Sequence, residues 1–343
     1  MEFAIAAVMI AVLITLAFGL AFSIGANDET SAPLAAAGTL KLKVVLIIGG
    51  AAIAFGTIFL SQGVASLVGE KILGPGIKYT VFMLLAVLIS AIIWLIIGSF
   101  AGIPLSSTHS LVGSIFGVVI VYALFYGGVD LSNAFNWEIL GGVVLSWFLS
   151  PLFGLLVTFG SYKIIEKLYL SKKKGLIEIE KSEKKFSWAL LLAIIFAEIW
   201  VGANSAEALG ILYALYSNGS LTLVGYYFFV VICAIFAFIG LYIAGRYVIR
   251  NLASQLTDAR PSDGFIIQIS SAIILMFCTV IYSVPVSHSH VIVFSIIGLN
   301  IAKKKEVDYK GLGKMTIFWI LTFPVAAILA GFIYFGFITF GLY

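Results

Sequence analysis

The sequence has 343 residues, of which 62% are hydrophobic and only 10% are charged. Soluble proteins carry about 25% charged residues, so this composition excludes a soluble globular domain and predicts a protein embedded in lipid. The net charge of +4 does not indicate a nucleic-acid partner, because the basic residues lie between apolar runs and form no stripe on one face. Cys233 and Cys278 each lie inside an apolar run and offer neither a disulfide framework nor a zinc-ligand spacing.

Several stretches lack Asp, Glu, Lys and Arg and are long enough to cross a bilayer core of about 30 Å. They are residues 3–27, 44–69, 79–129, 139–162, 208–245, 265–302 and 315–343. The stretch 79–129 must hold two crossings with a break near Gly102 and Pro104, and residues 189–200 add a span that reaches Glu198. We expect ten crossings in an all-α polytopic membrane protein. The first segment has neither a basic start nor a small-residue cleavage site, so we expect a retained helix and not a signal peptide.

Two motifs recur in the same order along the chain. Gly-Ala-Asn-Asp at 25–28 returns as Gly-Ala-Asn-Ser at 202–205, and Pro-Leu-Ser-Ser-Thr-His at 104–109 returns as Pro-Val-Ser-His-Ser-His at 285–290. Between the copies lies a hydrophilic stretch, 163–185, with eight Lys and four Glu. The sequence therefore predicts a first transmembrane repeat over 1–162, a charged cytoplasmic linker over 163–187 and a second repeat over 188–343.

The charges of equivalent loops predict the orientation of the two repeats. The loop 126–138 has no Lys or Arg, whereas its counterpart 300–314 has five Lys. Equivalent loops are therefore expected on opposite sides, which is the inverted-repeat architecture of secondary transporters with broken or re-entrant helices. If the central Lys-rich loop is cytoplasmic, every Lys and Arg except Lys71 and Lys78 lies inside, and both termini lie outside the cell membrane.

Acidic residues within the apolar segments are the first candidates for function. Asp28 and Glu29 follow the first Gly-Ala-Asn, Glu198 and Glu207 flank the second, and neither patch contains Lys or Arg. A carboxylate buried without a partner must be protonated or must bind a cation. All three histidines, His109, His288 and His290, also fall in the duplicated motifs, which makes them candidates for coupling to protons.

The duplicated motifs also have the composition of helix starts. Gly frees the backbone, Asn and Asp can cap, and hydroxyl side chains after each Pro are good N-caps ahead of apolar helices. Four helix N-termini are predicted, and such ends bind oxyanions without Arg or Lys. The hydroxyl residues are Ser106, Ser107, Thr108, Ser287 and Ser289. They can equally be caps without a role in binding.

A different class of function stays open at this point. The three histidines with Asp28, Glu198 and Glu207 could ligate a divalent metal in an intramembrane metal-binding protein or enzyme. No HExxH spacing occurs, and His288 and His290 are two residues apart, so they do not share a helix face.

Taken together, the two motif pairs resemble the inorganic phosphate transporter (PiT) family. Further stretches with the resemblance are Phe55-Gly56 through Gly63-Val64 and Gly264-Phe265 through Gln268. The resemblance covers nearly the whole chain. It implies a transporter and not an enzyme, which imports inorganic phosphate by symport with sodium or protons through alternating access. A minority of the family carries sulfate, so a sulfate permease of the same fold is the alternative.

The resemblance also assigns residues to the two sites. It implies phosphate binding by Asn27, Ser106, Ser107, Thr108, Asn204, Ser287 and Ser289. For cation binding or coupling the candidates are Asp28, Glu29, Ser205, Glu207, His109, His288 and His290, with no metal beyond sodium, no cofactor, and lipid as the surroundings. The oligomeric state is open, with a homodimer as one option.

The sequence departs from the family pattern at three places. Ser205 stands where the family repeats Asp, Glu29 and Thr30 follow Asp28 where the family has an apolar residue and Ala, and His288 replaces a Thr. The first change removes a carboxylate, for which Glu207 is a candidate substitute. The third puts a titratable imidazole beside the expected anion, which favours proton coupling.

Overall fold

A computed structural model describes residues 2–28, 38, 41–75, 77–126, 130–254 and 259–341. Within these ranges the regular elements are helices, joined by short turns and one isolated β-bridge between Leu73 and Phe135. Helices are expected because lipid offers no partner to backbone N–H and C=O groups, so each span must satisfy its own. The prediction of an all-α polytopic membrane protein is confirmed.

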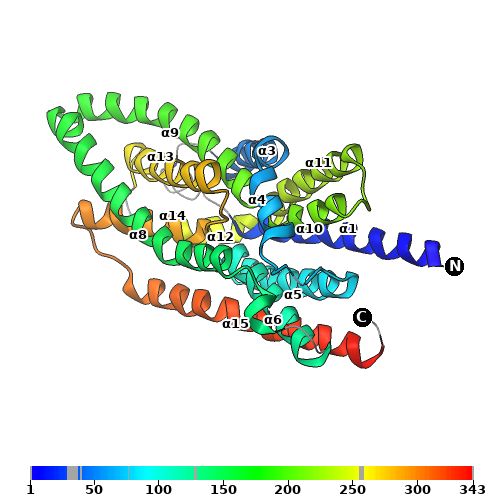
Figure 1. The fold of residues 1–343 in the computed structure, drawn as a ribbon. Helices are drawn as coiled ribbons and strands as arrows, with labels where there is room; N and C mark the ends of the chain where they lie inside the picture. Colours follow the sequence, from blue (N-terminus) through cyan, green and yellow to red (C-terminus); the bar gives the residue numbers. More distant parts are fainter. Residues whose placement is uncertain are drawn as a thin grey trace.

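The elements follow one another along both halves of the chain (Figure 1). The long helices of the first half are α1 (Glu2–Asn27), α3 (Leu42–Leu60), α5 (Val81–Phe100), α6 (Ser107–Tyr126) and α8 (Trp137–Leu168). Those of the second half are α9 (Leu176–Asn204), α11 (Leu223–Gly240), α13 (Pro261–Phe277) and α15 (Tyr309–Thr339). The shorter helices are α4 (Gln62–Ser66), α7 (Leu131–Ala134), α10 (Glu207–Ser217), α12 (Arg246–Ser254) and α14 (His288–Ala302), with π-helical turns at Leu67–Lys71 (η1), Leu241–Gly245 (η3) and Cys278–Tyr282 (η4).

The number of full crossings differs from the expected ten. In the described ranges, 9 helices are long and apolar enough to span a membrane. The helix that follows Pro285, α14, has only 15 residues, which rise about 22 Å and fall short of a core of about 30 Å. The break expected near Gly102 and Pro104 is confirmed, because α5 ends at Phe100 and α6 begins at Ser107.

Helices of the first half pack against helices of the second half. Helix α1 packs on α11, and α9 packs on α3. Glycines allow the backbones to touch at both crossings: a Cβ built on Gly56 would lie 1.8 Å from the carbonyl oxygen of Ile199. At these two crossings, the glycines where a Cβ would come this close to a carbonyl are Gly25, Gly56, Gly202 and Gly240. Close approach through small residues is what holds helices together in lipid, where apolar burial gives no driving force.

The last helix of each half likewise packs against a helix of the other half. Helix α8 lies against α14, and α15 lies against α6. Gly117 and Gly298 make these contacts close, because their Cβ atoms would lie 1.9 Å and 2.4 Å from the carbonyl oxygens of Ala327 and Leu155. Contacts in one half thus have counterparts in the other.

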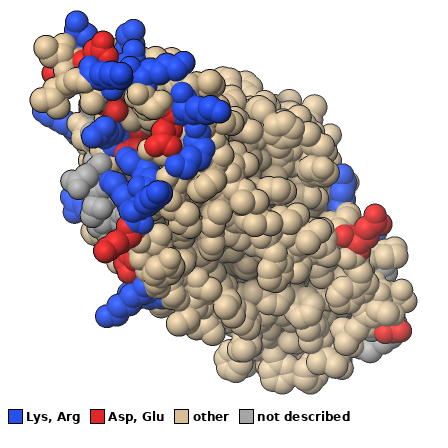
Figure 2. Space-filling view, turned by 90° about the vertical axis from the view of Figure 1, so that its left-hand side faces the viewer, with Lys and Arg blue, Asp and Glu red and all other residues tan. Residues whose placement is uncertain are grey.

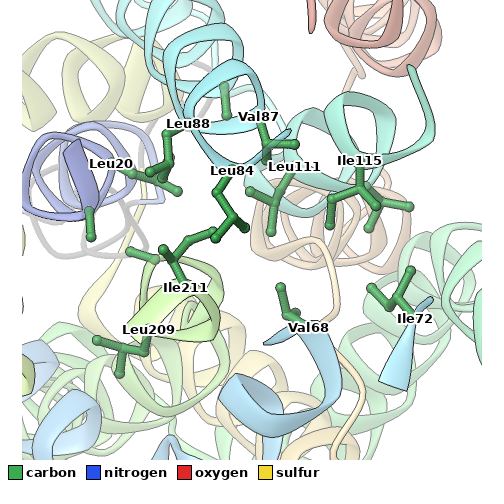
Figure 3. Close-up of a cluster of buried hydrophobic side chains, with 14 of the residues drawn as sticks. Leu20, Val68, Ile72, Leu84, Val87, Leu88, Leu111, Ile115, Leu209 and Ile211 are labelled. Atoms are coloured by element: carbon green, nitrogen blue, oxygen red, sulfur yellow. The ribbon is translucent and has the colours of Figure 1, made fainter. Parts of the chain in front are cut away.

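Apolar side chains fill the space between α1, α5, α6, η1 and α10. Figure 3 shows Leu84 pointing toward Ile211 of α10 and Leu88 beside Leu20 of α1, with Leu111 of α6 in the same cluster. Helix α10 belongs to the second half, so this core also crosses between the halves. The core therefore fixes where the end of α1 and the start of α10 lie.

The charged central stretch is helical rather than a loop. Helix α8 continues to Leu168 and α9 begins at Leu176, so only the residues between them form the turn. With 32 residues, α8 is about 48 Å long and exceeds the bilayer core. In Figure 1 this turn lies at the opposite end of the molecule from both termini, and Figure 2 shows Lys and Arg gathered on that end.

The close backbone contact at Gly56 gives a test of this packing. We expect Gly56→Ala to lower the melting temperature of the detergent-solubilised protein, because the added methyl group must displace the backbone of α9, at a cost of about 1–3 kcal/mol. The matched control is Gly160→Ala in α8, where nothing lies within 4 Å of the added Cβ. Equal melting temperatures for the two variants would contradict this packing.

Candidate functional site

Two asparagines at helix ends hold the extended segments that follow the breaks. Asn27, the last residue of α1, donates from Nδ2 to the carbonyl of Leu105 (2.5 Å) and accepts from its N–H (3.2 Å). Asn204, the last residue of α9, does the same with Val286 N–H (2.8 Å) and the Val284 carbonyl (3.1 Å). Both carboxamides are buried and bind backbone in this conformation. They position the segments before α6 and α14.

Each extended segment is entered through a residue in the left-handed region. Gly102 has φ of +66° and Ser283 has φ of +51°, and the two occupy equivalent positions of the repeated motif. Left-handed backbone costs a non-glycine residue about 1–2 kcal/mol. The second segment therefore keeps the same reversal of chain direction despite an unfavourable residue.

The tips of the two broken segments meet. Ser289 Oγ, in the first turn of α14, donates to the Leu105 carbonyl (2.6 Å) ahead of α6. Ser106 and Ser287 cap these helices by accepting from the N–H groups of His109 (3.2 Å) and His290 (3.4 Å). The N-termini of α6 and α14 are thereby brought to one place, and their caps are the hydroxyls expected from the sequence.

Six side chains from both halves, which we call the carboxylate cluster, converge beside these N-termini. Ser107 Oγ donates to Asp28 Oδ2 (2.6 Å) and lies 3.2 Å from Glu207 Oε1, which also accepts from Thr108 Oγ1 (2.8 Å). Ser205 Oγ donates to Asp28 Oδ2 (3.1 Å). The sixth member is His288, whose Nδ1 lies 3.5 Å from Asp28 Oδ2 and 3.3 Å from Ser205 Oγ.

The charge of the carboxylate cluster is not balanced by fixed cations. Asp28 and Glu207 are 2% and 1% exposed, and within the described ranges neither has a Lys or Arg nitrogen within 4.0 Å. Ser107 has one hydroxyl proton for two carboxylates. Asp28 Oδ1 and Glu207 Oε2 are buried and have no hydrogen-bond partner among the described residues. Two buried carboxylates so placed require a proton or a bound cation.

A small cavity lies against Asp28. It has a volume of about 20 Å³ and is lined by Asp28, Thr57 and Ser205 together with apolar residues of α1, α3, α9, α10 and α11. A cavity of about 10–15 Å³ holds one water-sized species. It can therefore take one dehydrated ion or one water, and in this conformation the cavity is too small for a tetrahedral oxyanion.

His109 and His290 form a separate pair. Their ring centroids are 5.1 Å apart in an edge contact. Trp147 of α8 stacks on His109 at 3.8 Å, and Trp319 of α15 meets His290 at 4.3 Å. His109 Nδ1 also lies 2.5 Å from Ser106 Oγ. These contacts pack α8 against the start of α6 and α15 against the start of α14. They involve neither Asp28 nor Glu207.

The structure thus brings some predicted residues together and separates others. Of the cation candidates, Asp28, Ser205, Glu207 and His288 form one cluster, and Glu29 lies outside the described residues. Of the four predicted helix starts, those of α6, α10 and α14 are present, and the one after Asp28 falls outside the described residues. The metal hypothesis gains no support, since the described ranges contain no group of three His, Cys, Asp or Glu side chains placed to hold a metal ion.

Several residues of the site did not stand out in the sequence. Thr57 lines the cavity from α3, and Thr279 accepts from Asn204 Nδ2 (2.8 Å). Trp147 and Trp319 precede Pro151 and Pro324 by four and five residues. A Trp followed by a Pro thus occurs in the last long helix of each half, and the unequal spacing makes this similarity hard to see in the sequence.

The chain is similar to known phosphate transporters. A family model described as the phosphate transporter family matches residues 24–330. A probable low-affinity inorganic phosphate transporter of Bacillus subtilis is 28% identical, over 94% of this chain and 95% of the relative. A protein of Pyrococcus horikoshii named as a phosphate permease is 26% identical over 93% and 95%. A solved structure of a sodium-dependent phosphate transporter shares the fold, with a TM-score of 0.83 at 21% identity over 97% of this chain and 99% of that one.

The contacts of Asn204 predict a structural role beside any role in binding. We expect Asn204→Ala to lower the melting temperature in detergent, because it leaves the buried Val286 N–H without a partner, at about 1–3 kcal/mol, and removes a donor from the half-buried Val284 carbonyl. Ser205→Ala, the neighbouring substitution, should change the melting temperature much less. If Asn204→Ala were as stable as the parent protein, the structural role of Asn204 would be excluded.

Proposed function

Since the chain belongs to the phosphate transporter family, we propose that it imports inorganic phosphate by symport with sodium or protons through alternating access. The observation that carries this proposal is the carboxylate cluster, in which Asp28 and Glu207 share Ser107 with no Lys or Arg within 4.0 Å among the described residues. Such a cluster needs a mobile cation for neutrality. No bond of the substrate changes, and the protein is a carrier.

The cation site that we propose is the cavity beside Asp28. Asp28 Oδ1 has no hydrogen-bond partner in the described chain, and the Thr57 and Ser205 side chains line the same space. Oxygen ligands of this kind suit a hard monovalent ion. The name of the structural relative, a sodium-dependent phosphate transporter, supports sodium, whereas the contact of His288 with Asp28 (3.5 Å) supports a proton.

The anion would bind where the N-termini of α6 and α14 meet. The donors there are the first-turn N–H groups and, once they turn away from Asp28, Glu207 and the Leu105 carbonyl, the hydroxyls of Ser107, Thr108 and Ser289. Helix dipoles favour negative charge at this end. Phosphate and cation then lie side by side, so that each lowers the cost of burying the other. Asn27, Asn204, Ser106 and Ser287 serve mainly to hold these donors in place.

The matched contacts support an inverted repeat that could alternate between two access states. Asn27 with Leu105 corresponds to Asn204 with Val286, and Gly102 corresponds to Ser283. Two similar halves around one closed site can exchange conformations, which opens the site to either side in turn. The repeats would be residues 1–162 and 188–343.

The distribution of charge supports an orientation in the membrane. Both termini lie at the end of the molecule opposite the α8–α9 turn, where the Lys-rich stretch lies (Figures 1 and 2). Basic residues favour the cytoplasmic side. We place the α8–α9 turn in the cytoplasm and both termini outside.

Uptake into proteoliposomes tests the proposed transport. A sodium gradient and a proton gradient are imposed in separate experiments, and we expect labelled phosphate to accumulate in one of them. The gradient that drives accumulation identifies the coupling ion. Excess sulfate should not compete. Accumulation of sulfate in place of phosphate would favour the alternative substrate, and uptake that needs neither gradient would reject symport.

Neutralising Asp28 tests the cation site. We expect Asp28→Asn to reduce gradient-driven phosphate uptake at least tenfold while the protein still inserts, because the cation loses its only formal charge in the cavity. Glu138→Gln, an exposed acid in the first turn of α8, is the control and should transport normally. Full activity of Asp28→Asn would show that the coupling cation does not bind in this cavity.

The hydroxyls of α6 test the anion site. We expect Ser107→Ala combined with Thr108→Ala to raise the KM for phosphate at least fivefold at saturating cation, because two donors leave the oxyanion. Ser110→Ala, one turn further along α6, is the control, since its hydroxyl donates to the Ser106 carbonyl (2.9 Å). An unchanged KM in the double variant would show that neither hydroxyl binds the anion and that both donate only to the carboxylates.

A further inference from the structure

A second binding feature lies far from the transport site, where the α8–α9 hairpin leaves the membrane. Here a groove of about 480 Å³ runs between the end of α8 and the first turns of α9. We call it the basic groove. Its lining includes Tyr169, Lys173, Lys181, Lys184, Lys185 and Trp188.

The charges of the basic groove are unbalanced. Four lysines line it against one acid, Glu178, and Glu178 already accepts from the backbone N–H of Lys174 (3.0 Å). Over the described ranges, no carboxylate oxygen lies within 4.0 Å of the four lysine nitrogens. Lys173 instead lies 4.8 Å from the ring centroid of Tyr169. The groove is thus prepared for an anion.

A neighbouring pocket of about 430 Å³ shows the contrast. It is lined by Lys303 and Asp263, which form an ion pair with the nitrogen 2.5 Å from the oxygen. Glu183, also in its lining, accepts from the N–H (2.9 Å) and hydroxyl (2.8 Å) of Ser262 at the start of α13. Lys303, Asp263 and Glu183 thus already bind the protein itself, whereas Lys181, Lys184 and Lys185 line the basic groove alone.

The position of the basic groove along α9 matches the surface of a bilayer. Lys181, Lys184, Lys185 and Trp188 lie three or four residues apart and therefore on one face of the helix. Trp188 is 68% exposed and directly precedes the apolar part of α9. Tryptophan favours the interface between lipid and water, and lysines one and two turns before it then lie about 5–10 Å further out, at the level of the headgroups.

We infer that the basic groove binds the headgroup of an anionic phospholipid from the leaflet at that end of the molecule. The phosphate of the headgroup lies among Lys181, Lys184 and Lys185, and the glycerol and upper acyl chain lie against Trp188. Basic pockets between transmembrane helices are the known chemistry for such lipids, and each lysine near the surface adds about fivefold in affinity. The bound lipid fastens the start of α9, the helix that ends at Asn204.

The test is native mass spectrometry of the intact, detergent-solubilised protein, titrated with phosphatidylglycerol or with phosphatidylcholine of the same acyl chains. We expect phosphatidylglycerol to bind at least tenfold more tightly. Lys181→Gln, Lys184→Gln and Lys185→Gln combined should remove this preference, and replacing the same three lysines by Arg should keep it. Lys304→Gln, Lys310→Gln and Lys314→Gln combined remove three exposed charges outside the groove and should leave the preference unchanged.

Three results would overturn the inference. The first is unchanged phosphatidylglycerol binding by the triple Gln variant of the groove. The second is an equal loss in the control triple variant, which would make the attraction a property of the net charge. The third is displacement of phosphatidylglycerol by millimolar inorganic phosphate, which would assign the groove to the free anion. Monodisperse elution of each variant shows that it is folded.

Discussion

The whole arrangement depends on the burial of two carboxylates that no Lys or Arg neutralises in the part of the chain that the structure describes. Asp28 and Glu207 come from different halves of the chain, and both reach Ser107 Oγ, at 2.6 and 3.2 Å. Lys or Arg within 4.0 Å would have made this a permanent ion pair; among the described residues only His288 approaches that closely. The site therefore stays incomplete in charge, and a mobile cation can complete it. Burial makes that requirement strict, because water cannot screen the two groups.

The scaffold places these groups through backbone contacts more than through side-chain chemistry. Asn27 and Asn204 use their carboxamides to hold the segments before α6 and α14, and close glycine contacts bring α1 to α11 and α9 to α3. Helix ends in lipid leave N–H and C=O groups that must find partners. The same free N–H groups that would make such ends unfavourable in lipid make them suitable for an anion.

The end of the molecule with the α8–α9 hairpin differs from the transport site in its charges. Lysines gather there (Figure 2), as they do where helices leave a bilayer and water and headgroups can solvate them. Some of these charges tie helices together, as Lys303 does with Asp263 (2.5 Å) and Glu183 with Ser262. Others line the basic groove, with no carboxylate oxygen within 4.0 Å of their nitrogens among the described residues. Some charges at this end therefore have a structural use, and we propose that the others bind a ligand.

The sequence alone determined the fold class and the break at Gly102 and Pro104, because hydropathy and Gly or Pro are local signals, and its repeated polar residues predicted a duplication. It also singled out Asp28, Glu207, Ser107, Thr108 and His288, since polar groups are rare in apolar segments. Only the tertiary structure decided that these five meet, that His109 and His290 pair with tryptophans instead, that α14 is too short to span and that the charged stretch is helical. Those outcomes depend on which helices of one half pack against the other half. That packing is set by backbone contacts between residues that are distant in sequence.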